Sequence, residues 1–136
     1  MSSRPLSPAD YRTLAQFRYA LRVFQRFSED AARSAGVTPS QHQLMLAIKG
    51  WGGSEDPAVG DLAEVLQLKH HSAVELVQRA AQADLVIAST DPDDARRQLI
   101  TLTEKGEEIL ASLSLTHRDE LRRFRSEMAD ILDELG

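Results

Sequence analysis

Residues 59–83 read VGDLAEVLQLKHHSAVELVQRAAQA and contain two short helical stretches that lie close together in the chain. Apolar residues recur at helical spacing over residues 59–66 and again over residues 70–83. Only Gln67-Leu68-Lys69 separates the two stretches. This spacing is typical of a helix-turn-helix motif, in which the second helix enters the major groove of DNA.

A β-hairpin is expected directly after this motif. The runs 86–90 (VIAST) and 98–102 (QLITL) are short and rich in β-branched residues. Residues 91–97 between them contain Asp and Pro, which favour turns, so we expect two strands and a polar tip over 91–97. A helix-turn-helix followed by a hairpin is a winged helix, whose wing reaches the DNA backbone or the minor groove.

Further helices are expected on both sides of this region. An apolar stripe runs from residue 10 to residue 34, and Thr38-Pro39-Ser40 begins a second helix that leads into residues 41–50. After the hairpin, Thr103 caps a helix, and a final helix carries the repeat Leu121, Phe124, Met128, Ile131 and Leu135. The predicted order is helix, helix, helix-turn-helix, hairpin, helix, helix. The terminal repeat favours packing in a dimer, with an ordinary core helix as the alternative.

The second helix of the pair has one apolar face, suited to packing, and one polar face. Its polar groups can bind base edges or phosphates, since Gln suits adenine and a carboxylate accepts from the cytosine amino group. A helix face that is merely solvated is the alternative. The candidate DNA-contacting residues are Lys69, His70, His71, Ser72, Glu75, Gln78 and Arg79 of this segment, and Arg96 and Arg97 of the hairpin.

The composition limits how such binding could work. The chain has 136 residues, 42% of them hydrophobic, which suits one globular domain, and a formal net charge of −5. Six arginines against three acidic residues make residues 1–35 basic, whereas the rest is acidic. DNA binding must therefore depend on a few placed cations. The longest apolar run, 44–48, is too short to span a membrane, and the N-terminus lacks an apolar signal region, so we expect a cytoplasmic protein.

Several kinds of chemistry are disfavoured. The absence of cysteine excludes disulfides and thiolate sites. His70 and His71 are neighbours on a helix and diverge by about 100°, which suits a metal poorly. Ser72 lacks the strand-turn context of a nucleophile elbow. We therefore expect no enzyme, no metal and no cofactor. A winged-helix dimer that acts through protein contacts, without DNA, remains the alternative function.

Residues 57–106 resemble the MarR family of bacterial transcriptional regulators. The matching segments are Gly60-Asp61-Leu62-Ala63, Ser72-Ala73-Val74 with Arg79, Leu85-Val86, Asp94-Ala95-Arg96, and Leu102-Thr103-Glu104-Lys105-Gly106. The flanking helices extend the resemblance over nearly the whole chain. Where the family usually ends its recognition helix with Gly, this chain has Asp84, so a residue less suited to positive φ must form that cap.

The resemblance implies a mainly α protein in which a winged helix-turn-helix (38–103) with a two-stranded wing is flanked by dimerisation helices (10–34 and 104–135). It implies a homodimer on a pseudo-palindromic operator, with helix 70–83 in the major groove and wing 88–99 at the minor groove. By the same resemblance, Arg96 lies at the wing tip and Asp94 holds the wing in shape. It also implies a repressor that a small, often aromatic or phenolic, ligand releases by binding between the dimerisation helices and the winged helix.

Overall fold

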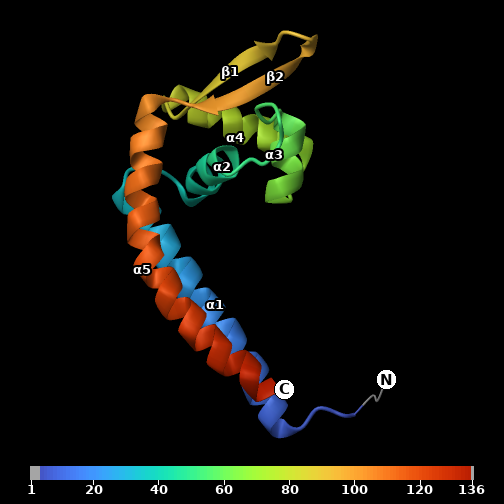
Figure 1. Cartoon of the computed structure of the whole chain (residues 1–136), viewed down its shortest axis with the longest axis vertical. Coiled ribbons are helices and arrows are strands. Elements are labelled where there is room, and N and C mark those ends of the chain that lie inside the picture. Colours follow the sequence, from blue (N-terminus) through green and yellow to red (C-terminus); the bar gives the residue numbers. More distant parts are fainter. Residues whose placement is uncertain (1–3, 136) are drawn as a thin grey trace. The chain divides into compact units, whose positions relative to one another are not determined.

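The computed structural model describes residues 4–135, which form five helices and two strands. In chain order they are α1 (Pro8–Ser34), α2 (Pro39–Lys49), α3 (Val59–Leu66), α4 (His70–Gln82), β1 (Val86–Asp91), β2 (Asp94–Leu102) and α5 (Glu104–Leu135) (Figure 1). The mainly α fold with a two-stranded antiparallel wing is confirmed. No helix within residues 4–135 combines the length and apolar character that crossing a bilayer requires.

The chain divides into two compact units. One contains α1 as far as Ala31 together with α5 from Ser114 onward, and the other contains residues 32–113. In the second unit, α3 and α4 pack against each other, against α2 and against the hairpin. Its core contains the fully buried side chains of Leu44, Met45, Leu62, Leu85 and Ile100.

In the first unit, α1 and α5 run antiparallel (Figure 1). Thr13 Oγ1 near the start of α1 donates to Glu134 Oε2 near the end of α5, at 3.3 Å. Further along α1, the rings of Phe24 and Phe124 lie 4.8 Å apart. Ser28 Oγ lies 2.8 Å from His117 Nε2, and both residues are buried. The residue numbers of the contacting partners decrease along α5 as they increase along α1, as expected for antiparallel helices.

Thr38 and Thr103 begin α2 and α5 as predicted. Thr38 Oγ1 accepts the N–H of Gln41 at 3.0 Å, and the Gln41 side chain accepts the N–H of Thr38, which completes a capping box. Thr103 Oγ1 accepts the N–H of Gly106 at 2.9 Å. The prediction of two helices after the hairpin is wrong, because α5 continues unbroken for 32 residues. Its sequence has no Pro or Gly between residues 107 and 135 to end it.

The hairpin pairs residues 86–90 with 98–102 as predicted, but both strands extend further. The turn contains only Pro92 and Asp93, because Asp91 Oδ1 accepts the N–H of Asp93 at 2.9 Å. Thr90 pairs with Gln98 and Asp91 pairs with Asp94, so residues 95–97 are extra on β2 and form a bulge. The prediction of a polar tip over 91–97 is therefore wrong for Arg96 and Arg97, which lie in this bulge and not in the turn.

As predicted, Asp84 takes a positive φ at the end of α4. The helix itself ends at Gln82, one residue before the predicted end at Ala83. Asp84 has φ 62°, in the left-handed region. Its N–H donates to Ala81 O at 3.0 Å, and the N–H of Leu85 donates to Ala80 O at 2.9 Å. This is a Schellman motif in which Asp takes the position that usually holds Gly.

Candidate nucleic-acid interface

Helix α4 has a buried face and an exposed face. Ala73, Val77 and Ala80 are buried against the rest of the second unit. The predicted contact residues occupy the remaining surface, since all are exposed except Ser72, which is half-buried. Lys69 is the N-cap residue and precedes them. The structure therefore gathers the predicted residues 69–79 on the accessible side and at the start of one helix.

Two of these residues are paired with each other. Arg79 Nη2 lies 2.7 Å from Glu75 Oε1, one helical turn away. Both side chains are more than half exposed, so the pair contributes little to stability. It does place one acidic and one basic group side by side on the exposed face of α4. An acid accepts from a cytosine amino group and an arginine donates to guanine, so the pair is able to read base edges.

A groove of about 400 Å³ joins α4 to the hairpin. His70, Val74 and Gln78 line it from α4, whereas Gln98 and Ile100 line it from β2. Both arginines of the bulge also border it. Polar groups of the second helix and of the wing, which the sequence could place only on separate elements, therefore share one depression in the surface.

The two arginines of the bulge have different partners. Arg96 is 92% exposed, and its Nε lies 3.3 Å from Asp94 Oδ1, which also accepts the backbone N–H of Arg96 at 3.0 Å. Asp94 thus ties the start of β2 to the arginine that follows. Arg97 is 43% exposed and its Nη2 lies 3.2 Å from Asp61 Oδ2 on α3. That same carboxylate oxygen accepts the N–H of Ala58 at 2.9 Å and caps the start of α3.

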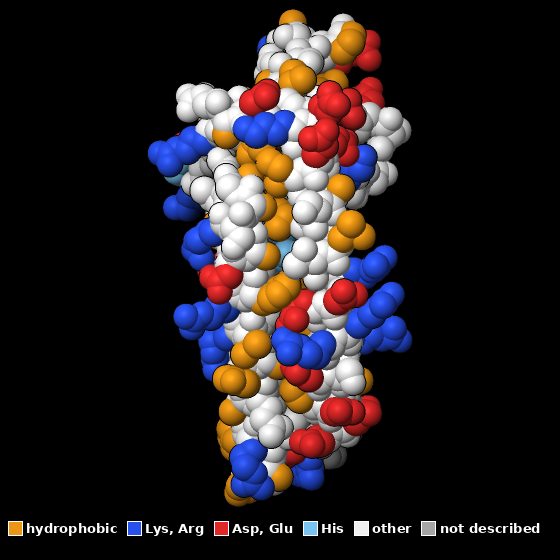
Figure 2. Space-filling view, turned by 90° about the vertical axis from the view of Figure 1, so that its left-hand side faces the viewer, with side chains coloured by type: hydrophobic (Ala, Val, Ile, Leu, Met, Phe, Trp, Pro, Cys, Tyr) orange, Lys and Arg blue, Asp and Glu red, His pale blue; other side chains and the backbone are white. Residues whose placement is uncertain are grey.

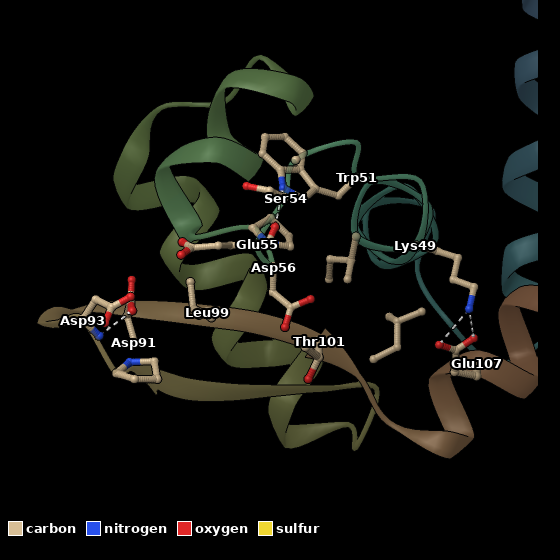
Figure 3. Close-up of a pocket in the computed structure, with 15 residues that line it drawn as sticks. Lys49, Trp51, Ser54, Glu55, Asp56, Asp91, Asp93, Leu99, Thr101 and Glu107 are labelled. Carbon is tan, nitrogen blue, oxygen red and sulfur yellow. Dashed lines mark hydrogen bonds and ion pairs between the residues drawn. The ribbon is translucent and has the colours of Figure 1, made fainter.

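A second depression, of about 610 Å³, lies where the loop after α2 meets β2 and the start of α5 (Figure 3). Leu99 and Thr101 line it, so the residues of β2 alternate between this cleft and the groove beside α4. Its carboxylates are those of Glu55, Asp56, Asp91, Asp93 and Glu107. Glu107 pairs with Lys49, Nζ to Oε2 2.9 Å. The remaining acids make this cleft unfavourable for phosphate, whereas basic residues border the groove beside α4.

Sequence reasoning missed this cleft and the role of Asp61. The cleft is assembled from residues 48–57 and residues 91–107, which lie at least 34 positions apart in the chain, and no local sequence pattern reveals that they meet. Asp61 did have a local signal, because an acid three residues after an N-cap commonly accepts the cap's N–H. Within residues 4–135, no three His, Asp or Glu side chains are grouped so as to hold a metal ion.

Comparison with known proteins shows which proteins the chain is similar to. Residues 35–97 match the model described as "MarR family". A Thauera aromatica protein, described as a candidate transcriptional regulatory protein for the hcr operon, is 24% identical over 113 residues, which are 83% of this chain. The chain spans 66% of the length of that relative.

Solved structures share the fold over most of the chain. AbsC of Streptomyces coelicolor, described as a MarR family transcriptional regulator, is 20% identical with a TM-score of 0.78, over 98% of this chain and 90% of AbsC. A mutant of S. aureus MepR bound to an oligodeoxyribonucleotide is 16% identical with a TM-score of 0.70, over 88% of this chain and 95% of MepR.

A third structure is that of Bordetella bronchiseptica BpsR, whose DNA binding is described as regulated by 6-hydroxynicotinic acid. It is 18% identical with a TM-score of 0.67, over 87% of this chain and 86% of BpsR. The sequence match covers the helix-turn-helix and much of the wing, and the shared fold extends to the long flanking helices. Residues 35–97 therefore match the MarR family model, and the fold that the chain shares with solved MarR-type structures extends over most of its length.

Proposed function

We propose that the protein is a homodimer that binds a pseudo-palindromic DNA operator, with α4 in the major groove and the hairpin at the adjacent minor groove. The observation that carries this proposal is the shared groove, in which His70 and Gln78 of α4 face the same depression as Arg96 and Gln98 of β2. One DNA backbone could lie along it, because a duplex presents major groove and minor groove on either side of a phosphate strand.

The charge distribution supports the same side of the molecule. The net charge of −5 gives no general attraction for DNA, so individual cations must contribute. Arg96 is 92% exposed and its only ion-pair partner among the described residues is Asp94, close by in the chain. It is therefore free to enter a minor groove, whose negative potential attracts arginine. The acidic residues of the second depression lie on the other side of β2.

The pair of long helices supports a dimer. Figure 2 shows hydrophobic side chains at the surface along both helices. The repeat of α5 is not fully covered, since Leu121 is 48% exposed and Phe124, Met128, Ile131 and Leu135 are only half-buried. Two helices cannot bury such residues from all sides, and a second copy would cover them. The other large exposed apolar residues of this unit are Leu6, Tyr11, Leu14, Tyr19, Val23, Leu115 and Leu132.

Selection of bound sequences from random duplex DNA tests this function. The expected result is enrichment of an inverted repeat whose half-sites are about 10 base pairs apart, centre to centre. Sedimentation at micromolar concentration should show a dimer. A failure to enrich any sequence, with a dimer still present, would favour a regulator that acts through protein contacts. A monomer of full length would contradict the proposed assembly.

We also propose that a small aromatic ligand weakens DNA binding and relieves repression. The support is the described regulation of BpsR by 6-hydroxynicotinic acid, together with the shared fold. The test measures the affinity for the selected duplex while phenols and aromatic carboxylates, beginning with 6-hydroxynicotinic acid, are added one at a time. A ligand that responds should lower the affinity in a saturable way, and a complete lack of response across the panel would contradict the proposal.

A further inference from the structure

The two neighbouring arginines of the wing have different surroundings. Arg96 is almost fully exposed, and its ion pair is with Asp94 in its own strand. Arg97 is less than half exposed, and its guanidinium reaches Asp61 on α3, 36 residues earlier in the chain. Both arginines lie in the bulge, where the regular alternation of side chains along the strand is interrupted.

The Arg97–Asp61 pair lies beside a backbone connection between the same two segments. The N–H of Ile100 donates to Pro57 O at 2.8 Å, and Ala58 and Leu99 form an isolated β-bridge. Asp61 caps α3 at the N–H of Ala58. The backbone contacts hold Leu99 and Ile100 of β2 against the start of α3. The ion pair holds Arg97, three residues nearer the hairpin turn than Ile100, against the same helix.

We propose that Arg97 is a positioning residue: its ion pair with Asp61 sets the wing relative to the helix-turn-helix, so that Arg96 and α4 can engage one duplex together. This inference rests on the proposed function. It separates the two arginines, which the sequence had grouped as DNA contacts. A phosphate contact by Arg97 would require its separation from Asp61 and would leave that carboxylate close to the DNA.

An exposed ion pair contributes little to overall stability, so the effect should appear in DNA binding and in local opening of the wing. The geometry predicts that Arg97→Ala lowers the affinity for the selected duplex about two- to fivefold. The slope of log affinity against log salt should not change, because no counterion release is lost. Arg96→Ala is the matched control, and it should lower that slope by about 1.

Asp61→Asn provides the second half of the test, because the amide oxygen can still accept the N–H of Ala58 while the charge is lost. It should weaken binding as much as Arg97→Ala, and the double variant should be no weaker than either single variant. Arg97→Lys should restore part of the affinity. Independent losses in the double variant, an unchanged affinity in Arg97→Ala, or a lower salt slope in Arg97→Ala would each overturn the proposal.

Hydrogen exchange without DNA keeps this test separate from the proposed function. The amide of Ile100 should exchange faster in Arg97→Ala and in Asp61→Asn than in the parent, and at the parental rate in Arg96→Ala. Equal exchange in all four proteins would overturn the positioning role even if DNA binding is found. If selection yields no bound sequence but the exchange pattern holds, the proposed function fails while the mechanical link between wing and α3 stands.

Discussion

Replacement of Gly106 by Ala should destabilise the protein, although Ala is the better helix former. A Cβ built on Gly106 would lie 2.3 Å from the carbonyl oxygen of Leu85 and 3.2 Å from its carbonyl carbon. Ordinary contact requires a separation of about 3.4 Å or more, so the backbone must move by about 1 Å. Leu85 is 1% exposed and its carbonyl accepts the N–H of Thr103 at 3.0 Å, so neither side can move without loss.

The magnitude follows from three contributions. Overpacking of this kind costs about 1–3 kcal/mol. Loss of the bond between Thr103 and Leu85 costs about 1 kcal/mol more. The helix propensity of Ala returns at most about 1 kcal/mol. The expected net destabilisation is therefore about 1–3 kcal/mol, or a fall of about 3–10 °C in the melting temperature.

Thermal unfolding followed by circular dichroism measures the change. Gly60→Ala is the matched control, because Gly60 also lies in the first turn of a helix, α3, but a Cβ there would meet nothing within 4 Å. That variant should be unchanged or stabilised by up to about 1 kcal/mol. If Gly106→Ala melts at or above the parent temperature, in line with Gly60→Ala, the close approach of Gly106 to Leu85 does not constrain the fold.

Other changes give equally definite expectations. Asp84→Gly should stabilise the protein by about 1 kcal/mol in urea unfolding, since Gly takes the left-handed position at the end of α4 without strain; a loss of stability would contradict this reading. Leu121→Glu should shift sedimentation toward monomer, whereas Arg122→Glu, an exposed neighbour, should remain dimeric. Hydrogen bonds from the backbone and side chain of Ser7 hold the pKa of Asp10 below its ordinary value, so this cap stabilises α1 at neutral pH and its contribution is lost as the pH falls through that lowered pKa. The difference in melting temperature between the parent and Asp10→Asn should therefore shrink between pH 6 and pH 3, and a constant difference would refute the assignment.

The elements that the sequence predicts well are those determined by neighbouring residues. The pattern of residues 59–83 and the threonine caps at Thr38 and Thr103 act within one or two helical turns, so they can be read locally. The cap at Asp84, where the MarR family usually has Gly, is also predictable locally, because it depends only on the φ of that one residue.

The features that the sequence does not predict depend on contacts between residues far apart in the chain, or on which of several possible partners a side chain binds. The narrow turn forms because Asp91 accepts the N–H of Asp93, and the same residues in another register would have formed the longer loop that was expected. The partner of Arg97 is 36 residues away, and nothing around Arg97 in the sequence distinguishes it from Arg96. The sequence suggests two helices in place of the unbroken α5 because the mostly polar segment 114–120 separates the apolar residues of 109–113 from the apolar repeat of 121–135.

Hydroxyl-radical cleavage of the selected duplex, with the parent and with Arg96→Ala, tests most directly whether α4 and the wing form the DNA interface of a dimer. The parent should protect two symmetric regions about one helical turn apart, each with a minor-groove segment that loses its protection in Arg96→Ala while the rest of the footprint persists. A single protected region, or a footprint that is identical in the two proteins, would contradict this arrangement.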